Sequence, residues 1–205
     1  MKKFVSLLLA VLMIAGVMTM LAACGSKDDS SSSAKDIPEG LEPQGNGSYM
    51  KFDYDKNGNV IRSYTYGYDY ELKSYKAYEY DEYNHVIREI DYNKQDQIQQ
   101  QFTYEKTPDG KILRQTRFNA DGEATSVMVC EYNEKNFVTA QYNYDGKGVL
   151  LNYELYEYDE NGVQTKESEY DGSGTMKYYK IFKTEADGHT TEYWYTPEGK
   201  LFRKD

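Results

Sequence analysis

The segment FDYDKNG at residues 52–58, with its later copy YEYDENG at residues 156–162, determines the fold of this chain. Each copy begins with aromatic residues at alternate positions, the pattern of a half-buried β-strand. Each ends in Asp-x-Asn-Gly, in which the Asx side chain hydrogen-bonds to the nearby backbone and Gly tolerates a positive φ angle. The segment therefore predicts a strand that runs directly into a hairpin turn.

The same turn recurs at a fixed interval along the rest of the chain. Turn residues lie 26 residues apart at Gly58, Asn84, Gly110, Asn136, Gly162 and Gly188. A second series with the same interval, shortened by one residue in the last copy, occupies Tyr70, Asp96, Gly122, Gly148, Gly174 and Gly199. Six copies thus tile residues 51–205, and each copy predicts two strands of about eight residues.

We therefore expect an all-β fold, an antiparallel meander of about twelve strands built from six 26-residue hairpin repeats. A flat open sheet of that size does not persist, so the sheet should be curved or coiled, and its closure is left open. Alternation along a strand predicts that positions 2, 4, 10, 14, 16 and 22 of each copy share one face, the core. Tyr75, Tyr153 and Tyr179 then fall on the opposite face.

The first 23 residues are typical of a secretory signal peptide. Lys2 and Lys3 precede a long apolar run that ends in Leu-Ala-Ala-Cys at residues 21–24. This ending resembles the lipobox of bacterial lipoproteins, and the resemblance implies that Cys24 is lipidated, with palmitate among its acyl chains, and becomes the new N-terminus. A single membrane-spanning helix is the alternative. We expect a lipid-anchored protein on the bacterial cell membrane, exposed outside the cytoplasm.

Residues 24–50 are rich in Ser, Asp, Gly and Pro after the lipidated Cys. Such a composition buries little apolar surface, so it predicts a disordered tether between the anchor and the repeat domain of residues 51–205.

The recurring Tyr-x-Tyr-Asp-x-x-Gly signature, seen at residues 52–58 and 156–162, resembles the YD repeats of Rhs-type bacterial surface proteins. In that family the repeats build long spiralling β-sheet shells, so the resemblance implies such a sheet for residues 51–205. The copy length of 26 departs from the commonest form of the repeat. MORN-like hairpin repeats are a looser resemblance, because their Gly-Glu-Trp-rich pattern is absent.

The composition excludes several classes of function. A formal charge of −10 provides no basic surface for nucleic acid. Two Cys and two His are too few for a four-ligand zinc site or a disulfide framework. His85 and His189 occupy equivalent turn positions four copies apart and are expected to be exposed, whereas Cys130 replaces an aromatic residue and is expected to be a small buried side chain. We therefore expect no enzyme activity.

One motif raises the question of calcium. Asp53, Asp55 and Asn57, followed by Gly58, match the first half of an EF-hand loop, but the twelfth position holds Tyr64 where a bidentate Glu is needed. A hairpin turn stabilised by Asx side chains explains the same residues. We expect no cofactor and keep calcium as the alternative.

The 23 Tyr are the remaining signal. Rows of rigid rings can bind sugars or a protein surface, and the candidate residues are Tyr64, Tyr66, Tyr142, Tyr144 and Trp194. Packing between neighbouring strands is the competing explanation.

We expect a surface or periplasmic lipoprotein that binds protein or glycan without catalysis. The alternative is a carbohydrate-active enzyme, which needs two carboxylates about 5–10 Å apart in a cleft.

Overall fold

The computed structural model describes residues 37–184 and 188–205. The chain divides into Met1–Asp36, which is outside the described residues, and Ile37–Asp205, which forms the sheet. The predicted signal peptide, Cys24 and the first part of the predicted tether therefore lie outside the described residues. Within residues 37–184 and 188–205, no helix has the length and apolar character needed to cross a membrane.

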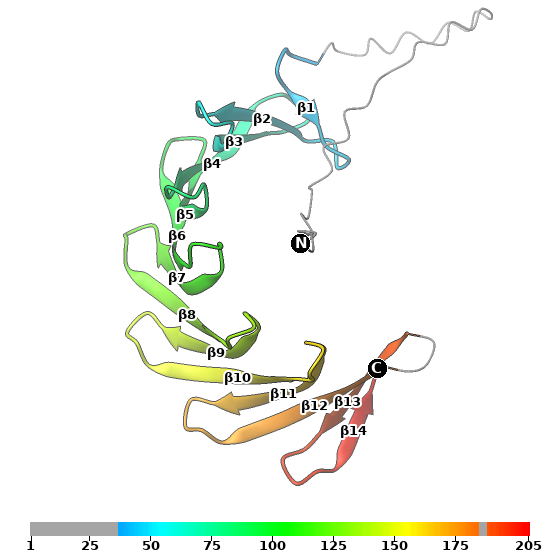
Figure 1. Cartoon of the computed structure of the whole chain (residues 1–205). Coiled ribbons are helices and arrows are strands. Elements are labelled where there is room, and N and C mark those ends of the chain that lie inside the picture. The colour runs from blue at the N-terminus through cyan, green and yellow to red at the C-terminus, as the bar shows by residue number, and fades with distance from the viewer. Residues whose placement is uncertain (1–36, 185–187) are drawn as a thin grey trace, which may run out of the picture. The chain divides into compact units, whose positions relative to one another are not determined.

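Ile37–Asp205 forms one antiparallel sheet of 14 strands that follow each other in sequence order (Figure 1). The strands are β1 (Glu42–Pro43), β2 (Tyr49–Tyr54), β3 (Val60–Tyr66), β4 (Leu72–Tyr80), β5 (Val86–Asn93), β6 (Ile98–Lys106), β7 (Ile112–Asn119), β8 (Ala124–Tyr132), β9 (Val138–Asp145), β10 (Leu150–Tyr158), β11 (Gln164–Asp171), β12 (Met176–Thr184), β13 (Thr190–Tyr195) and β14 (Leu201–Lys204). The all-β meander is confirmed, and the sheet is curved and open, since β1 and β14 do not pair.

The strand count exceeds the expected twelve because each repeat boundary falls inside a strand. β4, for example, contains the end of one 26-residue copy and the start of the next. The array also begins earlier than predicted. A turn at residues 44–48, closed by the Gln44 N–H bonding to the Ser48 carbonyl (2.8 Å), joins β1 to β2. The sheet therefore starts at Glu42, inside the segment that the sequence assigned to a disordered tether.

The turns share one geometry. In the first copy the Asp55 N–H donates to the Asn59 carbonyl (2.9 Å) and the Gly58 N–H donates to the Asp55 carbonyl (3.1 Å). The residue in the place of Gly58 has a positive φ angle in every copy, including Tyr70 at 61° and Asp96 at 60°. This is a type I turn followed by a left-handed residue that forms a bulge. All twelve predicted turn residues have a positive φ angle, so their prediction as turn residues is confirmed.

In three copies the second Tyr of the motif bonds to the preceding hairpin. The β3–β4 ladder ends at the pair Arg62 and Ala77, and beyond it the Tyr80 hydroxyl donates to the Val60 carbonyl (2.7 Å). The same bond joins Tyr132 to the Ile112 carbonyl (2.9 Å) and Tyr158 to the Val138 carbonyl (2.8 Å). The phenol thus satisfies a carbonyl where the ladder stops.

The predicted single core face is wrong, because nearly every hairpin contains a second bulge. The ladders from β2–β3 to β11–β12, and that of β13–β14, each include a register shift of one residue. Phe52 consequently pairs with Ser63, while Tyr64 pairs with Lys51 on the other side of the sheet. Paired residues share a face. Positions 2, 4 and 10 of the copies therefore lie on one face, and positions 14, 16 and 22 lie on the other.

We call these surfaces face A and face B. Face A carries Phe52, Tyr78, Tyr104, Cys130 and Tyr156; face B carries Tyr64, Tyr75, Ile90, Tyr142 and Tyr153. The β12–β13 ladder alone among the long ladders has no register shift, which matches the one-residue deletion in the last copy. Trp194 pairs with Lys180 and lies on face A, and its neighbours Tyr193 and Tyr195 lie on face B.

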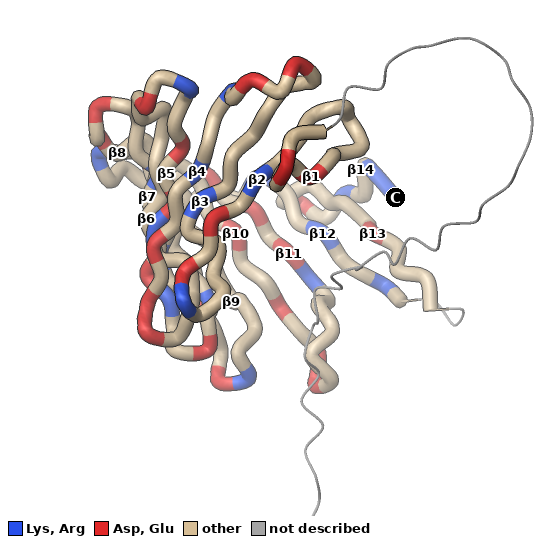
Figure 2. The backbone as a smooth tube through the Cα atoms, turned by 90° about the horizontal axis from the view of Figure 1, so that it is seen from above, with Lys and Arg blue, Asp and Glu red and all other residues tan. Residues whose placement is uncertain are grey.

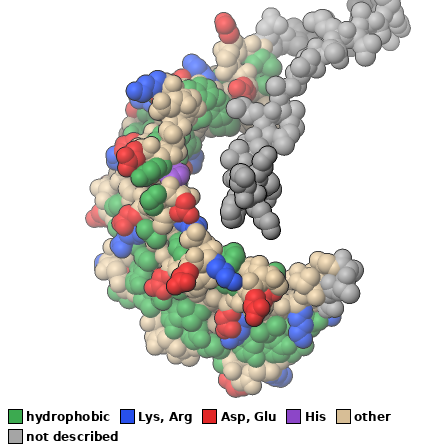
Figure 3. Space-filling view, in the orientation of Figure 1, with side chains coloured by type: hydrophobic (Ala, Val, Ile, Leu, Met, Phe, Trp, Pro, Cys, Tyr) green, Lys and Arg blue, Asp and Glu red, His purple; other side chains and the backbone are tan. Residues whose placement is uncertain are grey.

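The sheet is a single layer. Among the described apolar residues only Ile90, Val127, Cys130 and Ala140 are buried, and no large side chain is completely enclosed. Hydrophobic side chains alternate with charged ones over the surface of the array (Figure 3). Both faces are therefore half-exposed, and no second layer covers either of them within the described part of the chain.

Candidate functional site

Two rows of stacked Tyr rings dominate face B. In the first row Tyr64, Tyr75 and Tyr92 follow one another across β3, β4 and β5, with ring centroids 5.6 and 4.6 Å apart. The second row, three copies later, repeats these distances with Tyr142, Tyr153 and Tyr170 on β9, β10 and β11. The last pair of each row is nearly parallel, at 8° and 1°.

This geometry favours packing between strands over a sugar platform. Neighbouring strands lie about 4.8 Å apart, which is close to the distance between the stacked rings. Ring faces are therefore in contact with each other, and the row presents ring edges and hydroxyls to the solvent. Of the predicted residues, Tyr64 and Tyr142 begin the rows, while Tyr66 and Tyr144 pair with Leu72 and Leu150 beside them.

Sequence reasoning placed the middle ring of each row on the wrong face. Tyr75 and Tyr153 were expected on the opposite face, because the prediction counted strand alternation without the bulges. The recurrence of Tyr at position 25 of three copies was the available signal. It identifies a column of rings but does not show which strand partner each ring meets.

Trp194 lies apart from the other four candidate rings, on face A. Its indole lies between the Lys180 ammonium, 4.3 Å from the ring centroid, and the Arg203 guanidinium, 4.8 Å away. The Tyr178 ring is 5.0 Å from it. Its Nε1 is buried without a hydrogen-bond partner among the described atoms. The structure therefore does not bring the five predicted residues together into one site.

Face A carries ion pairs between neighbouring strands. Lys76 pairs with Glu89 (2.5 Å) and Asp91 (3.3 Å), and Lys180 pairs with Glu167 (2.5 Å). Acidic and basic positions are interspersed along the strands and many turns (Figure 2).

Glu154 and Glu169 lie directly opposite each other on face A. The Tyr156 hydroxyl donates to Glu154, and burial followed by this bond raises the pKa of Tyr156 strongly. Burial opposes ionisation of Glu169, but hydrogen bonds from Tyr178 and Lys177 outweigh it and lower the pKa of Glu169. Each carboxylate is thus stabilised by its own donors.

The residues of the calcium motif are engaged in the turn. Asp55 Oδ1 accepts the Asn57 N–H (2.8 Å) and the Asn59 N–H (2.9 Å). These bonds, led by that of Asn59, lower the pKa of Asp55. Asp53 belongs to β2 and accepts the Tyr64 hydroxyl (2.8 Å). Among the described residues no three His, Cys, Asp or Glu gather as metal ligands, and calcium at this turn stays a prediction to be tested.

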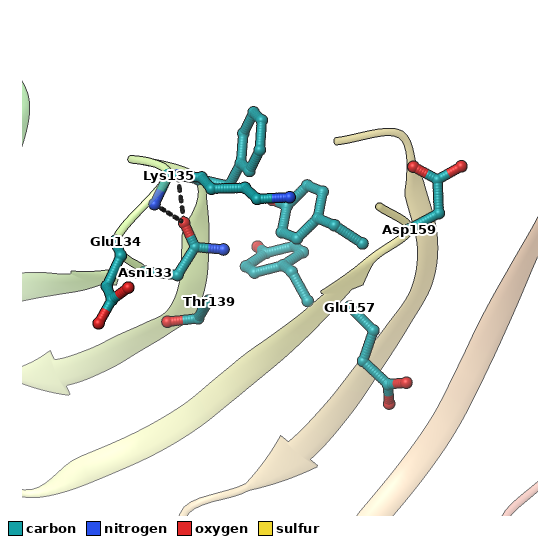
Figure 4. Close-up of a pocket in the computed structure, with 9 residues that line it drawn as sticks. Asn133, Glu134, Lys135, Thr139, Glu157 and Asp159 are labelled. Carbon is teal, nitrogen blue, oxygen red and sulfur yellow. Dashed lines mark hydrogen bonds between the residues drawn. The ribbon is translucent and has the colours of Figure 1, made fainter. Parts of the chain in front are cut away.

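A widely open hollow of about 620 Å³ lies between two consecutive turns on one edge of the sheet (Figure 4). This edge is a row of turns at the strand ends and not one of the edge strands β1 and β14. Its residues are Asn133, Glu134, Lys135, Phe137, Thr139, Tyr156, Glu157, Tyr158 and Asp159. Phe137 stacks on Tyr158 at 5.0 Å, and Lys135 donates to the Glu160 carbonyl (3.0 Å). The carboxylates of Glu134, Glu157 and Asp159 point in different directions, so they do not form a facing pair.

The remaining reactive side chains do not converge. Cys130 is buried on face A, as expected, and burial raises the pKa of its thiol. His85 is half-buried, contrary to expectation, because its ring lies against Gly110 of the neighbouring turn at residues 107–111; a Cβ built on Gly110 would stand 2.9 Å from His85 Nε2. His189 is exposed.

Comparisons with known proteins connect the fold to toxin components. No protein-family profile matches the chain, and no curated protein matches it significantly. A chain of the Photorhabdus luminescens Tc holotoxin pore is similar in structure, with a TM-score of 0.57 and 13% identity over 79% of this chain and 9% of that one. A chain of the crystal structure of TcdB2-TccC3-TEV gives 0.56 and 12% over the same shares.

This chain therefore spans less than a tenth of the length of those chains. At such identity the likeness shows the fold alone. That fold is the YD-repeat type of sheet that the motif resemblance implied.

Proposed function

We propose that this chain is a non-catalytic repeat module of a bacterial lipoprotein, which presents an open β-sheet outside the cytoplasm for binding a protein or a glycan. One observation carries the proposal: both faces of a single-layer sheet are half-exposed along its whole described length. Such a sheet offers side chains for contact on two sides without enclosing a reaction. The fold likeness to the toxin chains supports a scaffold or binding role.

The competing function is a carbohydrate-active enzyme. Its best candidates are Glu154 and Glu169, which face each other across β10 and β11. They lie on an open face and do not line the hollow beside Phe137, so a sugar there would not be shielded from water. The carboxylates that do line that hollow, Glu134, Glu157 and Asp159, point apart (Figure 4). Both features favour binding over hydrolysis.

A binding screen tests the proposal. The mature chain is applied to arrays of cell-wall glycans and of host surface proteins, and hydrolysis of each glycan is measured in parallel. Arg114→Glu on face B and Arg117→Glu on face A form a matched pair of charge reversals on the same strand. We expect one of them to weaken binding and the other to leave it unchanged. Turnover of any glycan would contradict the proposal, as would the absence of binding on both arrays.

The anchor is tested separately with Cys24→Ser. This change removes the acceptor of the lipid, so the protein should move from the membrane fraction to the medium or periplasm. Lys27→Arg, a conservative change three residues away, is the matched control and should leave the protein in the membrane fraction. Membrane association of Cys24→Ser in the absence of acylation would indicate that the apolar run is retained as a span.

A further inference from the structure

Three pairs of Tyr on face B lie ring against ring across neighbouring strands. The pairs are Tyr75 with Tyr92 (4.6 Å, 8°), Tyr153 with Tyr170 (4.6 Å, 1°) and Tyr179 with Tyr195 (5.0 Å, 10°). Each pair joins residues that are directly opposite in the ladder. Because both side chains leave the same face from paired positions and the rings are nearly parallel, the two ring faces lie against each other.

We propose that these pairs are sites of oxidative modification, at which a peroxidase-type oxidant with hydrogen peroxide forms dityrosine links within the chain. The links would fasten β4 to β5, β10 to β11 and β12 to β13. Cys130 is the only Cys among the described residues and is a free thiol, so no disulfide links strands in the described array.

The chemistry needs only the two phenols and the oxidant. Each phenol loses one electron to the oxidant and one proton to solvent or a nearby base, which leaves two phenoxyl radicals. The radicals join through a carbon–carbon bond between the positions next to the oxygens. The two ring hydrogens then move as protons to the oxygens, which restores both phenols. Hydrogen peroxide takes up the two electrons and two protons and becomes two waters.

The stacked geometry holds the two rings together, whereas two free phenoxyl radicals must first meet by diffusion. A radical pair held at near-contact distance reacts as a single molecule, with the large advantage of a preorganised encounter. All six rings are half-exposed rather than buried, so electrons can leave to an external oxidant. Tyr75 also has a proton acceptor: burial raises its pKa, and so does a hydrogen bond to the Asp96 carboxylate.

The three pairs should differ in rate. The Lys166 ammonium lies 5.7 Å from the Tyr179 ring centroid, and a positive charge disfavours removal of an electron from that ring. The Tyr179 pair also has the longest separation. Tyr153–Tyr170 and Tyr75–Tyr92 should therefore react before Tyr179–Tyr195.

The test oxidises the dilute, folded chain with peroxidase and hydrogen peroxide. The monomer should lose two hydrogens per link in its intact mass and gain dityrosine fluorescence, and peptide mapping should locate the first links at Tyr75–Tyr92 and Tyr153–Tyr170. Tyr170→Phe keeps a ring at that position but removes a phenol, so it should abolish the Tyr153–Tyr170 link and preserve the Tyr75–Tyr92 link. Tyr68→Phe, at a residue that is 84% exposed, is the control and should change neither link.

Unfolding provides the second control, because it removes stacking and exposes every Tyr. Oxidation in urea should scatter the links over many pairs. The proposal is overturned if links in the folded chain form first at the most exposed residues, Tyr54, Tyr68 and Tyr83. It is equally overturned if only links between chains are found, or if the pattern in urea matches that of the folded chain.

Discussion

At the scale of single residues, the turns depend on an oxygen acceptor at their first position. Asp55, Asp159 and Asp171 each accept two backbone N–H bonds through Oδ1, and Asn93 and Asn133 make the same bonds through an amide oxygen. Asp and Asn are therefore interchangeable for the turn. They are not interchangeable for a cation, because Asn brings no charge.

This equivalence separates the turn from a calcium site at Asp55. For a turn, Asp55→Asn should leave the melting temperature almost unchanged, and Asp55→Ala should lower it modestly through the lost bonds, with or without calcium. For a calcium site, the ion at 100 times its Kd should stabilise the native chain by about 2.7 kcal/mol.

We expect the first result, measured by thermal unfolding with calcium or a chelator. A calcium-dependent rise in melting temperature that both variants abolish would establish the site instead. Asp159→Asn, in the equivalent turn four copies later, is the matched control and should not alter any response to calcium.

Tyr70 shows what residue-level reasoning can and cannot reach. Its interval from the other turns identifies it as the left-handed residue of a turn, although a bulky side chain at φ 61° is unfavourable. The contact that accompanies this conformation, the Tyr49 ring at 4.8 Å, involves a residue that the sequence assigned to the disordered tether. Spacing along the chain predicts a conformation, but it does not predict a neighbour from outside the pattern.

At the scale of the hairpin, turns on the same edge of the sheet contact each other. Gly162 has a φ angle of 83°, and a Cβ there would stand 2.4 Å from Phe137 Cζ of the preceding turn on that edge. Gly122 has a φ angle of 81° and open space around the same position. The two residues share a backbone conformation and differ in packing, so they form a matched pair.

Gly122→Ala should lower the free energy of unfolding by about 1–2 kcal/mol, the cost of a side chain in the left-handed conformation. Gly162→Ala should lower it by about 0.5–1.5 kcal/mol more, because Phe137 must leave its stack on Tyr158. Urea unfolding measures both. In a Phe137→Ala background this excess should disappear, and its persistence would show that the turns are not coupled through the ring.

The bond from one hairpin to the previous one is tested with Tyr158→Phe. Loss of the hydroxyl leaves the Val138 carbonyl without its donor, so the free energy of unfolding should fall by about 1 kcal/mol. Tyr54→Phe, in the same column of the first copy and 56% exposed, should change it by less than about 0.5 kcal/mol. Equal effects of the two changes in urea unfolding would remove this bond from the explanation of the Tyr-x-Tyr motif.

The limits of sequence reasoning are clearest in the hairpin. Its turns were predictable because the Asx side chain bonds to backbone N–H groups no more than four residues away, and Gly adopts the positive φ angle by itself. Its faces were not, because the second bulge, with Ile61 as the extra residue of the first copy, is a property of the ladder between two strands. Trp194 shows the consequence: it aligns with Tyr64 in the repeat, yet it lies on the other face, because its own hairpin lacks the bulge.

At the scale of the whole array, the contacts follow sequence order, and each strand touches only its neighbours. Removal of one complete copy, residues 103–128, joins Phe102 to Val129 and should leave a shorter cooperative sheet with a smaller m-value in urea. Removal of residues 103–115 should disrupt folding, since the next strand would run in the wrong direction. Far-ultraviolet circular dichroism and urea unfolding compare the two deletions, and equal tolerance of both would refute the 26-residue unit.

The paired register shifts also bear on how such a chain varies between generations. Each complete copy contains two shifts, one in each hairpin, so the inversion made by the first is cancelled by the second. In-frame gain or loss of a copy by unequal recombination would therefore lengthen or shorten the sheet while every downstream side chain kept its side. Between β12 and β13 one shift and one residue are absent together, and Leu201, which pairs with Tyr195, lies on face B as Leu72 does. A change in copy number, or the loss of a bulge residue together with its shift, can thus occur without exchanging the two faces of the sheet.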